Sequence, residues 1–462
     1  MTHTLTLILL ALLAWPVATW AASDQSLTFE APSELLDRSK RDSTLREINA
    51  FGVDRVRALV YWKDFAPNAN SAKRPEFDAT DPAAYPARTW DQLDGLFAAA
   101  AERKVSVQVT LTGPVPRWAT RGNRDNVTDP DPDEFEAFAT AVGRRYGDRV
   151  SVWSIWNEPN HPQFLRPQFS NGHAASPTIY RRLFLAGEAG LRASGNADDM
   201  LLFGETAPRG TPNVVAPLAF LRGVLCLSPA YRPTRKCAKL PADGYAHHAY
   251  TTRAGPRFRP PDPDDVTIGV ISRLTTALNS AAKAGAISHG LGIYLTEFGI
   301  QSAPDPIVGV PLARQASYLA MAEHIAFANP RVRSFSQYLL RDDLPRSGNK
   351  AARYSGFESG LRHSDGRPKP AYEGFRLPLA AESYGLSDVL WGRVRPLAAR
   401  TEVTIQAQPA KGQPWADLKK VTTNSKGVFG LRSKHDDGQR YRVQWTAPDG
   451  KVWFGPPIQP SD

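Results

Sequence analysis

Apolar residues follow two different patterns along most of this chain. Short apolar runs, typical of buried parallel strands, alternate with longer stretches in which apolar residues recur every third or fourth position. The runs that predict strands are 27–31, 53–60, 105–111, 152–156, 200–204, 245–250, 292–296 and 332–340. The stretches that predict helices include 90–102, 135–146, 180–193, 266–284 and 312–328. This alternation favours a (β/α)₈ barrel over residues 25–378.

A doubly wound open sheet would show the same alternation of strands and helices. Such sheets usually carry a glycine-rich phosphate loop directly after the first strand. No loop of this kind follows residues 27–31. The sequence therefore favours the closed barrel over the open sheet.

The pattern changes after Pro378. Short alternating runs then predict strands at 389–394, 402–408, 419–423, 428–432, 441–446 and 452–454, with turns such as 425–427 and 449–450 between them. We expect a small β-sandwich over residues 384–462. Its tryptophans could fill the core or stack on sugar rings, and both uses stay open: Trp391, Trp415, Trp445 and Trp453.

The amino terminus has the features of a targeting segment. Residues 5–13 are almost wholly apolar, the first charged side chain is Asp24, and small residues surround position 21. This pattern predicts a signal peptide over residues 1–22 and hence a secreted, extracytoplasmic protein. The alternative is an uncleaved membrane anchor formed by residues 5–22.

The two cysteines, Cys226 and Cys237, lie close together in a loop-like stretch. In an oxidising compartment this spacing predicts a local disulfide, and the alternative is two free thiols. No histidine lies near either cysteine before His247, so the sequence does not suggest a metal site.

The chain of 462 residues carries a formal net charge of +10. From Tyr384 onward, twelve lysines and arginines stand against seven aspartates and glutamates. The excess is compatible with attraction to an anionic cell-surface polymer or with an ordinary basic exported protein. Because no Lys/Arg block of the nucleic-acid-binding type occurs, we do not expect a nucleic acid partner.

Two strands end in glutamates that suit glycosidic bond cleavage. Such cleavage needs a proton donor for the departing oxygen and a carboxylate facing the anomeric carbon. Glu158, after an apolar run with two tryptophans, suits the donor, and Glu297 suits the nucleophile. Arg57 and Tyr250, near the ends of two other strands, are candidates to keep Glu297 ionised.

Trp156-Asn157-Glu158-Pro159 on the fourth strand and Thr296-Glu297-Phe298-Gly299 on the seventh resemble clan A of the retaining glycoside hydrolases. The resemblance covers residues 25–378. It implies that Asn157 binds the 2-hydroxyl of the sugar, that Glu158 is the acid/base and that Glu297 is the nucleophile. It also implies that Arg57 and Tyr250 hold the nucleophile, and it implies no cofactor.

Further candidates surround this pair. Glu205 is a third carboxylate at a strand end and an alternative nucleophile. By strand alternation His248 faces the same side as Tyr250, whereas His247 suits packing. Trp62 is a candidate sugar platform or a lid over the core. The related enzymes usually carry a platform tryptophan after the eighth strand, and here Gln337 or Tyr338 takes that place.

The sequence thus predicts a secreted retaining β-glycoside hydrolase that acts on a poly- or oligosaccharide by double displacement. Two alternatives remain. One is a catalytically silent carbohydrate-binding or cell-surface protein, and the other is a transglycosylase that uses the same glutamates.

Overall fold

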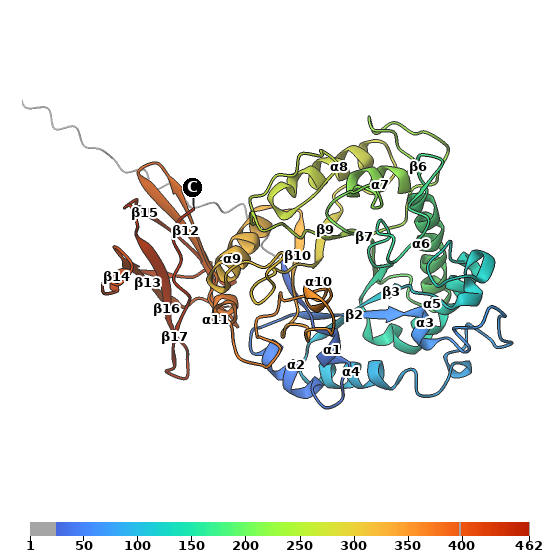
Figure 1. Cartoon of the computed structure of the whole chain (residues 1–462), viewed down its shortest axis with the longest axis horizontal. Coiled ribbons are helices and arrows are strands. Elements are labelled where there is room, and N and C mark those ends of the chain that lie inside the picture. Colours follow the sequence, from blue (N-terminus) through green and yellow to red (C-terminus); the bar gives the residue numbers. More distant parts are fainter. Residues whose placement is uncertain (1–24, 397–398, 462) are drawn as a thin grey trace, which may run out of the picture.

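A closed barrel of eight parallel strands forms the larger part of the computed structural model, which describes residues 25–396 and 399–461 (Figure 1). Each strand lies between its neighbours in the chain, and the last pairs with the first. The barrel strands are β1 (Ser26–Glu30), β2 (Arg55–Tyr61), β3 (Ser106–Thr112), β4 (Val152–Ile155), β7 (Met200–Thr206), β8 (Gly244–His248), β9 (Gly292–Glu297) and β10 (Val332–Tyr338). The predicted (β/α)₈ fold is confirmed. The predicted signal peptide, residues 1–22, lies outside the described residues.

Helices cover the outside of the barrel, as Figure 1 shows. The main ones are α2 (Arg41–Asn49), α4 (Asp91–Glu102), α5 (Pro132–Tyr146), α6 (Ser176–Ala193), α7 (Pro217–Val224), α8 (Ser272–Lys283), α9 (Leu312–Ala328) and α11 (Pro370–Arg376). Shorter elements are α1 (Pro32–Leu35), α3 (Trp62–Phe65), α10 (Lys350–Arg353) and the hairpin β5 (Phe169–Ser170) and β6 (His173–Ala174). None of the helices in the described part of the chain is both long and apolar enough to cross a bilayer.

Helix α5 shows how the sequence sets these boundaries. The Asp131 side chain accepts the backbone N–H groups of Asp133 and Glu134, so it caps the helix, and Pro132 occupies the first turn. The apolar stripe then faces inward, and Phe138 is fully buried. Packing of such stripes on the strands leaves the loops at the strand ends free to carry the site.

Two antiparallel sheets follow the barrel and lie beside α9 and α11 in Figure 1. One contains β11 (Leu379–Tyr384), β12 (Ser387–Arg393) and β15 (Val428–Lys434). The other contains β13 (Glu402–Gln408), β14 (Ala416–Thr422), β16 (Arg440–Thr446) and β17 (Val452–Phe454). These sheets fit the predicted sandwich, although β11 begins before the expected start at residue 384.

The tryptophans of this region divide between packing and partial exposure. Trp445 is buried in the core of the two sheets, and Trp391 stacks on His324 of α9 with ring centroids 5.2 Å apart. Trp415 and Trp453 are half-buried, and each lies against a guanidinium group. Two of the four therefore serve packing.

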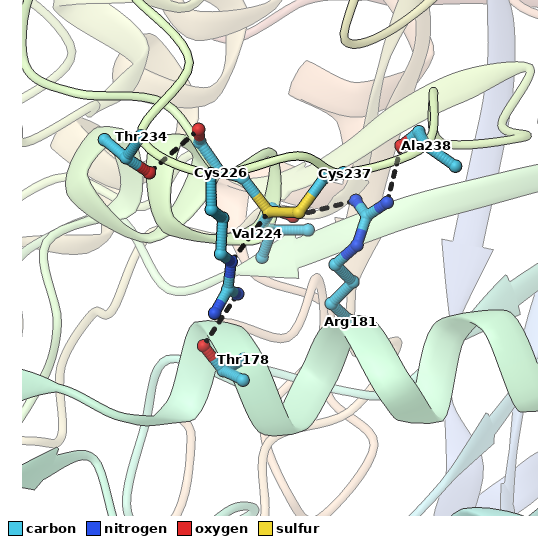
Figure 2. Close-up of a disulfide and its surroundings, with 8 residues drawn as sticks. Thr178, Arg181, Val224, Cys226, Thr234, Cys237 and Ala238 are labelled. Carbon is cyan, nitrogen blue, oxygen red and sulfur yellow. Dashed lines mark hydrogen bonds between the residues drawn. A yellow bond between two sulfur atoms is a disulfide. The ribbon is translucent and has the colours of Figure 1, made fainter.

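The predicted disulfide joins Cys226 and Cys237 (Figure 2). Arg181 of α6 lies beside it and donates hydrogen bonds to the carbonyl groups of Val224 and Ala238, at 3.0 and 2.6 Å. The Thr234 hydroxyl donates to the Cys226 carbonyl at 3.0 Å. The disulfide and these bonds tie the loop after α7 to α6.

Candidate active site

Four glutamates gather at the carboxyl end of the barrel. Glu30 ends β1, Glu205 lies near the end of β7, Glu297 ends β9, and Glu158 follows β4. Because the strands are parallel, their carboxyl ends open on the same face of the barrel. The sequence predicted Glu158 and Glu297 and named Glu205 as an alternative, but it missed Glu30. The same strand-end rule would have found it.

Arg57 on β2 links three of these carboxylates. Its Nη1 atom lies 2.6 Å from both Glu30 Oε2 and Glu297 Oε1, and its Nη2 atom lies 3.2 Å from Glu205 Oε2. The side chain is fully buried. A buried guanidinium with several carboxylate partners fixes their positions through charge-assisted hydrogen bonds.

His248 on β8 also links three of the glutamates: Glu158, Glu205 and Glu297. Its Nδ1 atom lies 3.0 Å from Glu158 Oε1 and 3.5 Å from Glu297 Oε2, and its Nε2 atom lies 2.8 Å from Glu205 Oε2. One nitrogen atom thus faces both predicted catalytic carboxylates. Because both oxygens lie close to the same nitrogen, Glu158 Oε1 and Glu297 Oε2 are at most about 6.5 Å apart. The carboxyl groups of inverting glycosidases are about 6.5 to 9.5 Å apart, so this bound excludes the larger separations in that range.

The pKa shifts follow from this arrangement. Burial lowers the pKa of His248, but the charge of Glu297 and hydrogen bonds to the other two glutamates outweigh it and raise the pKa to about 10. At neutral pH the imidazole is therefore a cation, so both of its nitrogens donate. Burial raises the pKa of Glu205, but Arg57 and His248 outweigh it and lower the pKa to about 2.

The pKa of Glu30 is shifted in the opposite direction to that of Glu205, although both side chains are buried. Burial raises the pKa of Glu30, the positive charge of Arg57 opposes this, and the result is a pKa of about 8. The negative charge of Glu297 contributes in the same direction as burial. Glu30 therefore retains a proton at neutral pH, which limits the negative charge around Arg57.

The exposure of the glutamates separates their roles. The side chains of Glu158 and Glu297 are 18% and 10% exposed, whereas the side chain of Glu205 is fully buried. Glu205 also accepts hydrogen bonds from the hydroxyls of Thr110 and Thr296. A carboxylate enclosed by donors on every side suits positioning of its partners rather than attack on a substrate.

The backbone at two of these glutamates is strained. Glu158 has φ of 40° and Glu205 has φ of 46°, both in the left-handed region that non-glycine residues seldom adopt. The Glu158 N–H donates to the Glu205 carbonyl at 2.9 Å, so the two strand ends hold each other. Strain of this kind is common where a site aims its side chains.

Asn157 and Tyr250 also lie at the site. Tyr250 Oη donates a hydrogen bond to Glu297 Oε2 at 3.2 Å, while Arg57 Nη1 donates to the other carboxylate oxygen, Oε1. Asn157 Oδ1 accepts from Arg57 Nη2 at 2.8 Å. This bond fixes the orientation of the amide, so its NH₂ group is free to donate toward a ligand.

Two residues predicted to bind substrate do not reach the site. Trp62 is 1% exposed, and its ring stacks on Phe138 with centroids 5.5 Å apart. Gln337 is fully buried, and its Nε2 donates to the carbonyls of Tyr338 and Ser359. Both side chains serve the interior, because aromatic rings enclose Trp62 and backbone carbonyls accept hydrogen bonds from Gln337. Trp62 fits the expected alternative of a lid over the core, and a sugar contact by Gln337 stays a prediction that its burial does not support. His247, in contrast, packs as expected, with Nε2 2.8 Å from the Val266 carbonyl.

An aromatic wall stands beside Glu297 in place of the expected tryptophan. Half-buried Tyr338 packs edge-on against Phe357, with centroids 5.0 Å apart, and Tyr250 lies 6.4 Å from Phe357. Phe357 is 39% exposed. The sequence named Tyr338 but not Phe357, because a lone aromatic residue in a long loop after the eighth strand gives no signal of where it packs.

Within the described residues no group of three or more potential metal-ligating side chains forms a metal site. The site offers two carboxylates that are slightly exposed, a cation beside each and an aromatic wall. This arrangement can protonate one atom of a ligand while placing a carboxylate close to another.

No protein-family profile matches the sequence, and no curated protein matches it either. Among solved structures, a family 39 glycoside hydrolase from the gut symbiont Bacteroides cellulosilyticus WH2 is similar with a TM-score of 0.53 and 16% identity. The match covers 91% of this chain and 81% of that one. This chain has the fold of that hydrolase.

Two further similar structures have lower TM-scores. A GH39 β-xylosidase from Caulobacter crescentus has a TM-score of 0.47 and 14% identity, over 83% of this chain and 82% of that one. The GH5_18 protein from Streptomyces cattleya has a TM-score of 0.48 and 21% identity, over 76% of this chain and 79% of that one.

Proposed function

We propose that this protein is an exported retaining β-glycoside hydrolase of clan A that acts on a poly- or oligosaccharide. The observation that carries the proposal is the meeting of Glu158 and Glu297 at the carboxyl end of the barrel, with His248 Nδ1 3.0 and 3.5 Å from their oxygens. The fold shared with a glycoside hydrolase agrees with it.

In the first step, Glu297 attacks the anomeric carbon and Glu158 protonates the departing oxygen. A covalent glycosyl-enzyme forms and the alcohol leaves. Arg57 and Tyr250 each donate a hydrogen bond to one oxygen of Glu297, which fixes the direction of the carboxylate. The free NH₂ of Asn157 is placed to bind the hydroxyl next to the reacting carbon.

In the second step, Glu158 removes a proton from water, and the water attacks the anomeric carbon and releases Glu297. Two inversions give net retention. His248 holds Glu158 through Nδ1 and is itself held by Glu205 through Nε2. Glu205 is therefore a positioning residue in this scheme.

Export is part of the proposal. The Cys226–Cys237 disulfide favours an oxidising compartment, where such bonds persist. The predicted signal peptide supports the same location.

The test is turnover of a panel of 4-nitrophenyl β-glycosides and β-linked polysaccharides, with product stereochemistry followed by proton NMR. We expect the β-anomer to appear first. First appearance of the α-anomer would contradict the retaining mechanism. Products longer than the substrate would favour transglycosylation, and binding of polysaccharide without any turnover would favour a silent carbohydrate-binding protein.

A further inference from the structure

A hollow of about 530 Å³ adjoins the candidate active site. It lies between the loops that follow β7, β8 and β9. Tyr250, whose hydroxyl bonds Glu297, forms part of its wall, and Gly299 follows Glu297 by two residues. A molecule in the hollow would therefore extend directly from the reacting centre. Its volume falls within the range of sites for small ligands.

Two arginines line this hollow, and no aspartate or glutamate does. Arg209 stands on the loop after β7 and Arg253 on the loop after β8, and both are exposed. In the described part of the chain neither guanidinium has a carboxylate oxygen within 4.0 Å. The charged side chains that line the hollow are therefore both cations, while Glu358 and Asp305 contact the lining residues Gln301 and Val308 without lining the hollow themselves.

Other contacts hold the two guanidinium groups without neutralising them. Arg253 Nη1 donates to the Ile307 carbonyl at 3.1 Å, and the guanidinium of Arg209 lies 5.9 Å from the centre of the Phe258 ring. Asp265 is near enough to respond to Arg209, but it is buried and its Oδ1 accepts the Gly210 N–H at 2.7 Å. Most N–H groups of both arginines remain free to bind an anion.

Much of the remaining lining is apolar and includes Pro208, Ile300, Val308 and Val310, while Thr251, Thr252 and Gln301 add neutral polar groups. Apolar walls with a few charged groups fit a sugar ring that carries an anionic substituent. A planar guanidinium matches a carboxylate or a sulfate through two parallel hydrogen bonds. A neutral sugar would leave the two charges without a partner.

We propose that the hollow is a subsite for an anionic sugar residue, one that bears a carboxylate or a sulfate ester, next to the bond that is cleaved. Arg209 and Arg253 bind the anionic group and Tyr250 contacts the ring. The subsite rests on the proposed glycoside hydrolase function and specifies its substrate class.

The test compares charged and neutral versions of the same oligosaccharide. The probes are a glucuronate-containing β-linked tetrasaccharide, its carboxyl-reduced counterpart, and the reduced compound carrying one sulfate ester. We expect the wild-type kcat/KM to be at least about tenfold higher for an anionic probe than for the neutral one. The better of the two anionic probes identifies the natural substituent.

The variants are Arg209→Gln, Arg253→Gln and the double variant, with Arg346→Gln as the matched control. Arg346 is an exposed arginine on the loop after β10, and it does not line the hollow. Each hollow variant should lose about tenfold in kcat/KM on the anionic probe through KM, while turnover of the neutral probe stays within about twofold. The control should change neither.

Three results would overturn the subsite. The wild type could process all three probes equally, the double variant could keep the preference, or Arg346→Gln could lose as much as the hollow variants. Turnover of 4-nitrophenyl β-glycosides separates this proposal from the function on which it rests. If those substrates react but the preference is absent, only the subsite is wrong. If no glycoside reacts, the hydrolase function itself fails.

Discussion

The Nη1 atom of Arg57 lies 2.6 Å from Glu297 Oε1, although the two residues are 240 positions apart in the chain. The same nitrogen lies 2.6 Å from Glu30 Oε2. Glu297 therefore stands beside a buried cation that it shares with a protonated carboxyl group. The guanidinium fixes the position of the Glu297 carboxylate, as a nucleophile requires.

The first prediction separates the two catalytic glutamates. Glu297→Ala should lower kcat by roughly four orders of magnitude or more on every substrate, because no glycosyl-enzyme can form. Glu158→Ala should still form the intermediate from activated aryl glycosides but stall at its hydrolysis, with a loss of about 10²- to 10⁴-fold. Stopped-flow release of nitrophenolate should then show a burst.

Added azide checks this assignment. In Glu158→Ala it should restore turnover and give the β-glycosyl azide, because azide needs no deprotonation. In Glu297→Ala it should give the α-azide by direct attack from the vacated face. The same azide anomer from both variants would contradict the assignment of Glu158 as acid/base and Glu297 as nucleophile.

Tyr250 provides the second prediction. Tyr250→Phe removes the 3.2 Å hydrogen bond to Glu297 Oε2 and keeps the ring. One hydrogen bond to a charged group contributes about 1.5 to 3 kcal/mol, so kcat should fall about tenfold or more. Steady-state kinetics on an aryl β-glycoside measure this, and thermal unfolding should change little. Unchanged kcat would mean that Tyr250 does not hold the nucleophile.

The sequence was sufficient for the barrel because both of its periodic patterns are strong. The run 292–296 and the helix 312–328 match β9 and α9 almost residue for residue. Helices α7 and α11 were missed because they are short and begin at a proline in a loop-like stretch. Strand β11 was missed because residues 379–384 do not alternate apolar and polar residues.

The chemistry was predictable where it depends on strand ends and not where it depends on packing. Glu158 and Glu297 follow from their positions at strand ends. Arg57 was expected at the end of the second strand, but it is the third of the seven residues of β2 and reaches the site from within the strand. Trp62 gave no sign that Phe138 and its neighbours would enclose it, because sequence order does not show which rings meet in space. The double role of His248 could not be predicted either, since it joins β4, β7 and β9 through side-chain contacts alone.

The third prediction concerns Glu205. Glu205→Gln replaces a buried anion that faces Arg57 and His248 by a neutral amide. Breaking a buried ion network costs about 3 to 5 kcal/mol, so the free energy of unfolding should fall by that order. The kcat should fall as His248 loses its support, and azide should not restore it. Azide rescue with formation of an α-azide would instead make Glu205 the nucleophile.

The fourth prediction concerns the disulfide. Replacing Cys226 and Cys237 by serine should lower the free energy of unfolding by about 2 to 3 kcal/mol, because the loop between them is short. Urea denaturation measures the change, and wild type under reducing conditions should behave as the variant does. Activity at 25 °C should stay within about twofold. Titration of two free thiols in the denatured, exported protein would contradict the bond.

The fifth prediction is the pH dependence of stability. Glu30 has its pKa raised from 4.5 to about 8 and His248 from 6.5 to about 10, so the folded state binds both protons more tightly than the unfolded chain. The contribution of Glu30 to the free energy of unfolding is fully present below pH 4.5 and is lost as the pH rises to 8. The contribution of His248 is fully present below pH 6.5 and is lost as the pH rises to 10. The pKa of Glu205 is lowered from 4.5 to about 2. Its contribution to the free energy of unfolding is therefore fully present above pH 4.5 and is lost as the pH falls toward 2.

These three groups together place the greatest stability near pH 4.5, with a fall on either side, because the Glu30 contribution already declines above that pH. Glu30→Gln tests the alkaline fall, because glutamine resembles the protonated carboxyl group but cannot titrate. Urea denaturation at pH 3, 4.5 and 8.5 should show a smaller loss in the free energy of unfolding between pH 4.5 and 8.5 in the variant than in wild type. The loss between pH 4.5 and 3 should be the same in both, since Glu205 is retained and the Glu30 contribution is constant below pH 4.5. An equal alkaline loss in both proteins would mean that folding does not raise the pKa of Glu30 and that Glu30 shares Arg57 with Glu297 as an anion.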